Sequence, residues 1–539
     1  MATYLFFIAN LFLKINSLCY YECISFFLGE FMFSKINSYG LMGLKGLKID
    51  VEVDTIAGLP RFDIVGLPDA AVKESKERVT SAIKNSGFKF PQKKVTINLA
   101  PASVRKIGPA FDLAIAVGLL VSSAQLEGNK YRDFIIIGEL GLDGKVKPVN
   151  GILPELISAR SEGFKNFIIP YDNKKEASFI DGINVFAVQS LLDATKFLSG
   201  EINILPIEKA VWKGELSDKV TEDFARVKGQ KIAKRAIEIA VSGGHNILMV
   251  GAPGAGKTMI SRCIPGIMPD LTFEEALEIT KIHSIAGELD PEKGVISSRP
   301  FRSPHHTAST VALTGGGRDS KPGEVSLASS GVLFLDEFPE YSRSTLESLR
   351  QPLEDGIITV SRANGTFEYP ANFMLVASMN PCPCGNYGSK DAVCTCTPTA
   401  IQNYHKRLSG PLLDRIDLKI DVERVAFNEI SNRSEEESSE EIKKRVDDAR
   451  QIQNKRFAGT SVHTNAKMNS KMLAEFCKLD DEGTALMQLA FDKYHISARG
   501  YTRLLKVART IADLDGSENI QASHIAEALA YRTIDKFQM

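Results

Sequence analysis

The segment 251–258, GAPGAGKT, constrains this chain more than any other, because it fits the pattern G-x-x-x-x-G-K-T in full. The apolar run at 246–250 predicts a short buried strand before it, and a helix is expected to begin at Lys257. Glycines in such a loop let backbone N–H groups close around phosphate oxygens. The sequence therefore predicts a strand, a loop and a helix that together bind the phosphates of a nucleotide.

The side chains of this segment have separate expected tasks. Lys257 is expected to reach the β- and γ-phosphates, and Thr258 to hold Mg²⁺. A chance glycine-rich turn is the alternative, but it would not explain a full match between an apolar run and a helix start. The predicted nucleotide-binding residues are Gly251, Ala252, Pro253, Gly254, Ala255, Gly256, Lys257 and Thr258, together with Asp336.

Asp336 belongs to a second chemical signal, the segment 331–337, GVLFLDE. Its apolar residues predict a buried strand, and its two acids stand at the carboxyl end, where open α/β sheets bind ligands. We expect Asp336 to hold Mg²⁺ and Glu337 to orient and deprotonate an attacking water. ATP and Mg²⁺ are thus the predicted substrate and cofactor of an ATPase.

Length and charge set limits on the rest of the chain. With 539 residues the chain is too long for one hydrophobic core, so about three domains are expected. Its formal net charge is −1, so any contact with nucleic acid must come from local basic patches.

The amino-terminal residues 1–31 do not fit the pattern of the rest. They are apolar, but charged residues interrupt them, and the uncharged runs are too short for an ordinary membrane-spanning helix. We expect a non-native or disordered extension, with translation starting at Met32; a membrane anchor is the alternative. The predicted location is the cytoplasm, with no membrane partner.

Four further segments follow from the patterning. Strand and helix patterns alternate over residues 32–200, and the polar segment 201–222 is typical of a linker. Residues 223–430 contain the phosphate loop, and residues 431–539 show helical patterns behind a polar hinge. The predicted fold class is α/β, with a P-loop αβα domain followed by a helical lid.

Several phrases in the first of these segments resemble the Lon-protease-like fold: residues 108–110 (GPA), 138–144 (GELGLDG) and 163–170 (GFKNFIIP). Members of that family cleave peptides with a Ser–Lys dyad. The serine position is Ala110 in this chain, and the lysine position is Leu153; neither side chain can act as nucleophile or base. The resemblance therefore implies a non-catalytic module for assembly or substrate handling.

Longer phrases resemble the Mg-chelatase-like AAA+ group typified by ComM and YifB, over residues 32–539. They are residues 299–307 (RPFRSPHHT), 315–317 (GGG), 349–356 (LRQPLEDG) and 380–385 (NPCPCG). The resemblance implies a homo-hexameric ring with an amino-terminal Lon-like domain. It also implies ATP-driven movement on single-stranded or branched DNA, including branch migration during natural transformation.

The same resemblance assigns three more catalytic residues. Asn380 stands where AAA+ proteins keep a sensor between the γ-phosphate and the water. Arg415 stands where related ATPases reach into the neighbouring subunit's nucleotide, although a surface arginine paired with Asp414 or Asp417 is the alternative. Arg499 opens a lid helix, where an arginine touches the γ-phosphate, and Arg503 is the second candidate for that role.

Residues around His305 and His306 are expected to belong to an insert that lines the pore of the ring. The pair could bind a metal or act as a base, but loop or packing residues are the more ordinary interpretation. Arg299, Arg302 and Arg318 are the candidates for contact with DNA phosphates. A hairpin is predicted beside them at 357–369.

The remaining cluster is Cys382, Cys384, Cys394 and Cys396, four of the eight cysteines of the chain. Two C-x-C pairs can supply four thiolates in tetrahedral order, so Zn²⁺ is possible here. The spacing is not the common C-x₂-C, so reduced loop cysteines and a redox-labile pair stay open. A metal would brace the loop directly after Asn380.

Three functions are compatible with these observations. The first is a ring ATPase that moves on DNA. The second is the motor of a metal-chelatase complex, which remodels a protein partner, although such motors usually lack a Lon-like domain. The third, an ATP-dependent peptidase, is disfavoured by Ala110 and Leu153.

Overall fold

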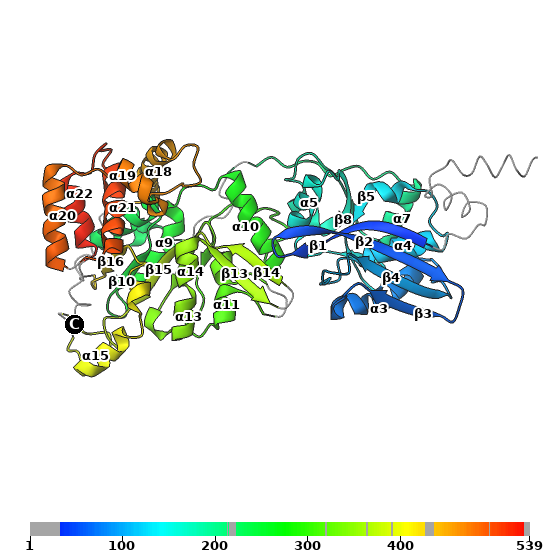
Figure 1. Ribbon diagram of the computed structural model, residues 1–539, viewed down its shortest axis with the longest axis horizontal. Coiled ribbons are helices and arrows are strands. Elements are labelled where there is room, and N and C mark those ends of the chain that lie inside the picture. The colour runs from blue at the N-terminus through cyan, green and yellow to red at the C-terminus, as the bar shows by residue number, and fades with distance from the viewer. Residues whose placement is uncertain are drawn as a thin grey trace, which may run out of the picture. The chain divides into compact units, whose positions relative to one another are not determined.

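The computed structural model describes residues 33–532 apart from 213, 215–221, 318–320, 363–364, 390–391, 426–435 and 495. The expectations for residues 1–31, for most of the linker and for Arg318 lie outside the described residues. The chain divides into two compact units, which are coloured along the sequence in Figure 1. Unit 1 comprises Met1–Trp212, His283–Val295 and Ala363–Gly365, and unit 2 comprises Lys213–Ile282, Ile296–Arg362 and Thr366–Met539.

Unit 1 is built on a seven-stranded mixed sheet with the order β3-β4-β2-β1-β5-β8-β9. Its strands are β1 (Phe33–Met42), β2 (Lys45–Ile56), β3 (Arg61–Val65), β4 (Lys94–Ala100), β5 (Phe134–Ile136), β8 (Asn166–Pro170) and β9 (Asn184–Val188). The long β1 and β2 pair antiparallel along the whole of β1 (Figure 1). Side chains alternate along β2, where Ile49, Val51 and Val53 are all buried.

Helices pack on the sheet of unit 1, and the most apolar of them is fully buried. They are α3 (Ala70–Asn85), α4 (Asp112–Ser122), α5 (Ile152–Ser161), α6 (Lys174–Ala177) and α7 (Leu191–Ser199). The central α4 contacts β1 and β2, and every one of its residues is buried, which explains its almost unbroken apolar sequence. Its one charged residue, Asp112, forms an ion pair with Arg78 at 2.6 Å. A short pair, β6 (Glu139–Leu140) with β7 (Val146–Lys147), completes the unit.

Neither position of the Lon-like dyad has a side chain that could act in peptide cleavage. Leu153 is fully buried within α5, where it belongs to the packing of the unit. Ala110 precedes α4, and its carbonyl accepts a hydrogen bond from Gly138 N at 2.8 Å. The apolar side chains at both positions leave unit 1 without the Ser–Lys dyad of that fold.

Unit 2 contains a five-stranded parallel sheet with the order β11-β12-β15-β10-β16. Its strands are β10 (Ile247–Val250), β11 (Phe301–Arg302), β12 (Val332–Leu335), β15 (Met374–Met379) and β16 (Leu418–Asp421). Because β10, β12 and β15 are parallel neighbours, the segments that follow them meet at one edge of the sheet. That edge carries the phosphate loop, Asp336 and Asn380.

The helices between the linker and the lid are mostly short. They are α8 (Lys231–Gly243), α9 (Lys257–Cys263), α10 (Phe273–Ala286), α11 (Thr310–Thr314), α12 (Glu324–Leu327), α13 (Arg343–Ser348), α14 (Arg350–Asp355), α15 (Pro398–His405) and α16 (Gly410–Leu413). The predicted hairpin is confirmed as β13 (Ile357–Arg362) and β14 (Gly365–Pro370). No helix in the described part of the chain is long and apolar enough to cross a membrane.

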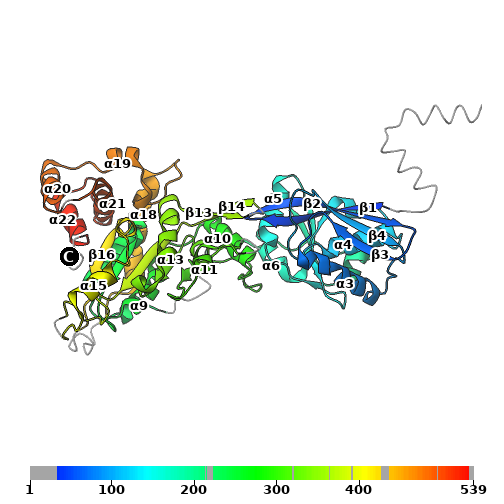
Figure 2. The same cartoon turned by 60° about the horizontal axis from the view of Figure 1, so that its bottom comes forward.

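The lid helices form one group in Figures 1 and 2, coloured orange to red. They are α18 (Ser439–Arg456), α19 (Ser470–Phe476), α20 (Asp481–Tyr494), α21 (Ala498–Leu514) and α22 (Ala522–Ala530). A capping box between Ser438 and Glu441 starts α18. The helices α18 and α21 pack against α8, and a single apolar core joins the lid to the sheet.

Candidate nucleotide site

The phosphate loop lies at the edge of the sheet in a cleft of about 400 Å³. Gly254 and Gly256 have φ angles of +77° and +90°, which other residues rarely adopt, and neither has an atom within 4 Å of its missing Cβ. Gly251 is required for a different reason, because a Cβ there would lie 2.3 Å from the carbonyl oxygen of Val422. The loop thus leaves its backbone open on the side of the cleft.

Lys257 directs its amine into this loop. Its Nζ donates to the carbonyl oxygens of Gly251 at 2.6 Å and Ala252 at 3.1 Å, and to Asn380 Oδ1 at 3.3 Å. Burial lowers the pKa of Lys257, and the nearby carboxylates of Asp336 and Glu337 oppose that shift. The loop lysine and Asn380 therefore lie within hydrogen-bond distance of each other at the cleft.

Asp336 is held by hydroxyl and amide donors. Thr258 Oγ1 donates to Asp336 Oδ2 at 3.0 Å, and Ser378 and the Glu337 amide donate to Oδ1. The neighbouring oxygens of Thr258 and Asp336 are the hard ligands that Mg²⁺ prefers. The open loop and this oxygen pair fit a nucleotide phosphate with its metal ion.

Glu337 also lines the cleft, directly after Asp336. Its backbone is left-handed, with φ 52° and ψ 45°, which is uncommon for a residue other than glycine. Its side chain is 53% exposed, and its Oε2 lies 3.0 Å from Nδ1 of His306. Sequence reasoning missed this contact, because no local pattern pairs a loop histidine with an acid on another strand.

The three arginines lie elsewhere in unit 2. Arg415 donates to Glu354 and to the Pro411 carbonyl, and Arg499 Nη2 lies 4.0 Å from Glu354 Oε1. Arg503 donates to Asp417 Oδ1 at 2.6 Å. All three line a second pocket of about 150 Å³, and none of them lines the nucleotide cleft. The catalytic residues predicted from the sequence thus fall into two groups.

Arg415 is not the surface arginine of the alternative interpretation. It is only 6% exposed, and its partner is Glu354 rather than Asp414 or Asp417. Its Nε is buried and has no hydrogen-bond partner among the described residues.

Arg299 and Arg302, the candidates for contact with DNA phosphates, are engaged with other parts of the fold. Arg299 donates to the carbonyl oxygens of Pro269 and Ser330 at 2.6 and 2.7 Å, and pairs with Glu275. Arg302 forms two hydrogen bonds to Glu324, at 2.6 and 2.8 Å. These contacts hold Arg299 just before β11 and Arg302 at its end.

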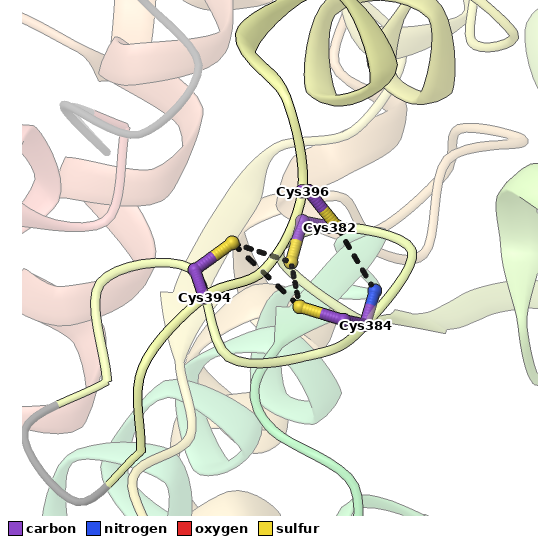
Figure 3. Close-up of side chains that lie close together, drawn as sticks. All are labelled: Cys382, Cys384, Cys394 and Cys396. Atoms are coloured by element: carbon purple, nitrogen blue, oxygen red, sulfur yellow. Dashed lines mark hydrogen bonds between the residues drawn. The ribbon is translucent and has the colours of Figure 1, made fainter.

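The four cysteines come together as predicted from their spacing (Figure 3). Their sulfur atoms all lie within 4.8 Å of one another, and they are the only such group of potential metal ligands among the described residues. Hydrogen bonds from the backbone lower the pKa of Cys384 to about 5, whereas the pKa values of Cys394 and Cys396 are raised, with the neighbouring cysteines among the causes. Four sulfur atoms this close together can hold a metal ion.

The cysteine loop also touches the phosphate loop. Gly385 has a φ of +80°, and a Cβ there would lie 2.4 Å from Pro253 Cδ. Since Pro253 is part of the phosphate loop, the cysteine cluster and the nucleotide site share a contact. The histidine pair, in contrast, belongs to no metal-ligand cluster within the described ranges.

Comparison with known proteins agrees with this geometry. Residues 223–430 match the family model described as magnesium chelatase, subunit ChlI, and residues 436–532 match the model of that subunit's C-terminal part. Residues 51–173 match a further model, described as subunit ChlI of Mg-chelatase. The chain is 43% identical over 505 residues to the competence protein ComM of Haemophilus influenzae, covering 93% of this chain and 97% of that protein.

The chain belongs to the Mg-chelatase-like ComM/YifB family. It is also 42% identical over 504 residues to the uncharacterized protein YifB of Escherichia coli, again with 93% and 97% coverage. A 142-residue region is 31% identical to Lon protease 2 of Bacillus subtilis, covering 25% of each chain. As a member of the ComM/YifB family this chain is an AAA+ ATPase with a Lon-like region, and its family implies ATP and Mg²⁺.

Proposed function

We propose that this protein is a ring-forming motor that uses ATP hydrolysis to move on DNA, in branch migration of recombination intermediates during natural transformation. The relative ComM of Haemophilus influenzae is a competence protein, which supports the biological setting. The observation that supports a ring is that the predicted catalytic residues line two separate pockets. Asp336, Glu337 and Asn380 line one cleft, whereas Arg415 and Arg499 line another.

This division suits a site completed by two subunits. Lys257 and the amides of its loop bind the phosphates, and Glu337 accepts a proton from the attacking water. Mg²⁺ held by Thr258 and Asp336 would neutralise charge on the phosphate oxygens. Asn380 orients the water, and Arg415 and Arg499 stabilise the transition-state charge on the nucleotide of the adjacent subunit.

A homo-hexamer would place six copies of the insert around one pore. Lys321, in the described part of the chain after the histidine pair, is exposed, and its backbone is bridged to that of Gly316. A basic side chain there can bind single-stranded or branched DNA through phosphates, without reading sequence. This arrangement needs no excess positive charge on the chain as a whole.

The alternative is a metal-chelatase-type motor that remodels a protein partner. The three matching family models, all named for a magnesium chelatase subunit, favour it. Both proposals use the same ATPase site, so they differ only in what the ring acts on.

We also propose that the cysteine cluster holds Zn²⁺. Four thiolates are the ligand set of structural zinc sites, and the contact between Gly385 and Pro253 gives the ion a structural task beside the nucleotide. Thiols stay reduced in the cytoplasm, which is the proposed location of the protein.

One assay tests the choice between the two motors. ATP turnover is measured without DNA and with single strands, duplex and four-way junctions. The DNA motor predicts higher turnover with at least one of these, and greatest stimulation by single-stranded or branched DNA. Turnover that no DNA changes would refute the DNA motor and favour the remodelling of a protein partner.

A further inference from the structure

The backbone of Arg415 is held by two side chains from distant parts of unit 2. Asn246, directly before β10, donates from its Nδ2 to the Arg415 carbonyl oxygen at 3.0 Å. Arg503, on α21, donates from its Nη1 to the same oxygen at 2.9 Å. The guanidinium of Arg415 takes no part in these bonds, because it is directed to Glu354. The starting point of the Arg415 side chain is therefore fixed independently of its own partner.

Asp417 is the anchor of this arrangement. It is buried, its Oδ1 accepts from Arg503 at 2.6 Å, and its Oδ2 accepts from the backbone amide of Asn246 at 3.0 Å. His245 Nδ1 lies 3.6 Å from the same Oδ2. Burial alone would raise the pKa of Asp417, but His245 and the charge of Arg503 hold it below its ordinary value. A carboxylate that stays charged in the interior keeps the guanidinium of Arg503 in place.

The lid helix α21 reaches this anchor at two points. Arg503 and Thr510 are seven residues apart and so lie on the same face of the helix. Thr510 Oγ1 is 2.8 Å from His245 Nε2, while the other nitrogen of that ring faces Asp417. Only a glycine fits at Gly243, because a Cβ there would collide with the side chains of both His245 and Thr510. A shift of α21 relative to Asp417 would therefore break these contacts.

Asn246 joins the same contacts to the central sheet. It precedes β10, the strand that leads into the phosphate loop, and its Oδ1 accepts from Leu375 N on the neighbouring β15 at 2.9 Å. Its backbone oxygen accepts from Asp417 N at 3.0 Å. Arg415 is thus held between the lid and the sheet that carries the nucleotide cleft.

The two arginines at the start of α21 differ in their freedom. The side chain of Arg499 is 68% exposed, and its Nη2 lies 4.0 Å from Glu354 Oε1. The side chain of Arg503 is 24% exposed, and one nitrogen of it is bonded to both Asp417 and the Arg415 carbonyl. A guanidinium that is held by acceptors of its own chain has little freedom to reach a nucleotide.

We propose that Arg503 and Asn246 are positioning residues for Arg415, so that α21 sets where this arginine is presented to the neighbouring subunit. The lid of one subunit then determines the rate of hydrolysis in the next. The inference rests on the proposed role of Arg415 at the nucleotide of an adjacent subunit. It gives Arg503 a task other than contact with the γ-phosphate.

The test measures ATP turnover by five versions of the full chain: wild type, Arg503→Ala, Arg503→Lys, Asn246→Asp and Thr502→Ala. Asn246→Asp keeps the size of the side chain and the oxygen that β15 contacts, but it lacks the donor to the Arg415 carbonyl. Thr502→Ala is the matched control, because this hydroxyl donates to a carbonyl of its own helix. Thermal unfolding and binding of a non-hydrolysable ATP analogue establish that each variant is folded.

Arg503→Ala and Asn246→Asp should each lower kcat by up to roughly 10²-fold, the cost of displacing a reacting group by about 1 Å. KM and binding of the analogue should not change, because neither side chain lines the nucleotide cleft. Arg503→Lys, which keeps the charge beside Asp417, should restore part of the rate. Thr502→Ala should behave like the wild type.

Mixed assemblies show at which nucleotide Arg503 acts. Arg503→Ala mixed with Glu337→Gln should regain turnover, because hybrid interfaces combine an intact base with a correctly held Arg415. Arg503→Ala mixed with Arg415→Ala should regain none, because both variants fail at the same task. Recovery in the second mixture would overturn the inference, since it would place Arg503 at the nucleotide of its own subunit.

Asn246→Asp decides whether Arg503 acts through Arg415. Slow turnover by Arg503→Ala together with normal turnover by Asn246→Asp would refute the positioning and indicate direct contact of Arg503 with a nucleotide. Wild-type turnover by Arg415→Ala would instead refute the proposed role of Arg415 itself, and the inference with it. Absence of any stimulation by DNA would refute the DNA motor alone, because no DNA enters these measurements.

Discussion

Lys257 and Glu337 perform different tasks at the same cleft. Lys257 is buried and reaches the phosphate loop, whereas Glu337 is half exposed and its carboxylate lies beside His306. Lys257→Ala should therefore lose affinity for ATP, since it removes the charge that faces the phosphates. Glu337→Gln should bind ATP normally but hydrolyse it roughly 10²–10⁴-fold more slowly, the usual contribution of a general base.

Equilibrium binding of a fluorescent ATP analogue and steady-state turnover separate the two effects. Near-normal hydrolysis by Glu337→Gln would mean that another group activates the water.

Arg415 should act on the nucleotide of a neighbouring subunit. Its change to Ala should leave ATP binding intact and reduce hydrolysis by up to about 10³–10⁵-fold, the range for arginine fingers. Because Arg415 is nearly buried and paired with Glu354, its removal also costs stability, so thermal unfolding is measured in parallel. Glu354→Gln is the matched control, since it breaks the same pair but keeps the arginine.

Mixed assemblies then test the assignment between subunits. Arg415→Ala subunits retain Glu337, and Glu337→Gln subunits retain Arg415, so hybrid interfaces contain one complete site. Turnover should reappear when the two variants are mixed. A mixture as inactive as its components would contradict the assignment.

At the scale of elements, segment 283–295 is attached to unit 1 through a buried carboxyl cluster. Ser284 donates to Glu176 Oε2 at 3.0 Å, and Asn173 donates to Oε1 at 2.6 Å. Burial raises the pKa of Glu176 to about 7, against these hydrogen bonds, and burial beside Glu176 raises the pKa of Glu155 as well. The neutral acid is thus the form that the folded unit prefers.

The sign of the pH dependence follows from proton binding. Between the ordinary pKa of 4.5 and about 7, folded Glu176 keeps a proton that the unfolded chain has lost. The free energy of unfolding of unit 1 should therefore fall as the pH rises through this window, by roughly 1.4 kcal/mol per pH unit at most. Glu176→Gln should flatten the slope and stabilise the unit at pH 8.

Native-state hydrogen exchange of the amides in α5 and α6, measured from pH 5 to 8 and corrected for the intrinsic rate, reports on this unit alone. Equal slopes in the wild type and Glu176→Gln would assign the pH dependence to other groups.

The cysteine loop should support the phosphate loop through its metal. We expect the purified protein to contain one Zn²⁺ per chain, and its removal to loosen the loop at Gly385 and weaken ATP binding at Pro253. Cys394→Ser should have the same effect. Cys477→Ala is the control, because this buried cysteine lies in the lid outside the cluster.

Elemental analysis and ATP affinity before and after chelation measure both parts of this prediction. Metal loss that leaves ATP affinity unchanged would separate the cluster from the nucleotide site.

The elements that could be predicted from the sequence are those with local signals. Apolar runs predicted β10 and β12, and the parallel order of β12, β15 and β10 explains why Asp336 and Asn380 meet at the phosphate loop. The capping box at Ser438 and the cysteine cluster also have local signals, because each depends on residues close in sequence.

The unpredicted features depend on contacts between distant segments. The bonds of Arg299 to Pro269 and Glu275 join residues more than twenty positions apart, so the arginine looked available in the sequence. The same holds for His306 with Glu337, and for segment 283–295, which packs with unit 1 although its neighbours in sequence belong to unit 2. Periodicity reports which face of an element is buried, but it does not report which partner buries it.

At the scale of the whole molecule, the charge balance argues that DNA binding depends on assembly. The chain has a net charge of −1, so a single subunit has little long-range attraction for DNA. Six inserts around one pore would bring six copies of Lys321 together without any change in net charge. Binding should therefore require ATP or a non-hydrolysable analogue, show little sequence preference and weaken steeply with salt.

Lys321→Ala is the variant that tests this arrangement, because Lys321 is exposed while Arg299 and Arg302 are engaged in the fold. Each phosphate contact contributes about −0.9 to the log–log salt slope on duplex DNA, so losing these contacts should flatten the slope by that amount per contact. Basal hydrolysis should survive, since Lys321 lines neither the nucleotide cleft nor the arginine pocket. Lys471→Ala, an exposed lysine on the lid, should leave the slope unchanged.

The measurement is a DNA titration at several salt concentrations, with and without the analogue, together with the mass of the assembly. The salt slope and the assembly should change together, because counterions are released only where several phosphates are neutralised at once. Tight binding by single subunits, or binding that salt does not weaken, would contradict a pore formed by the insert. The ring would then be expected to act on a protein partner.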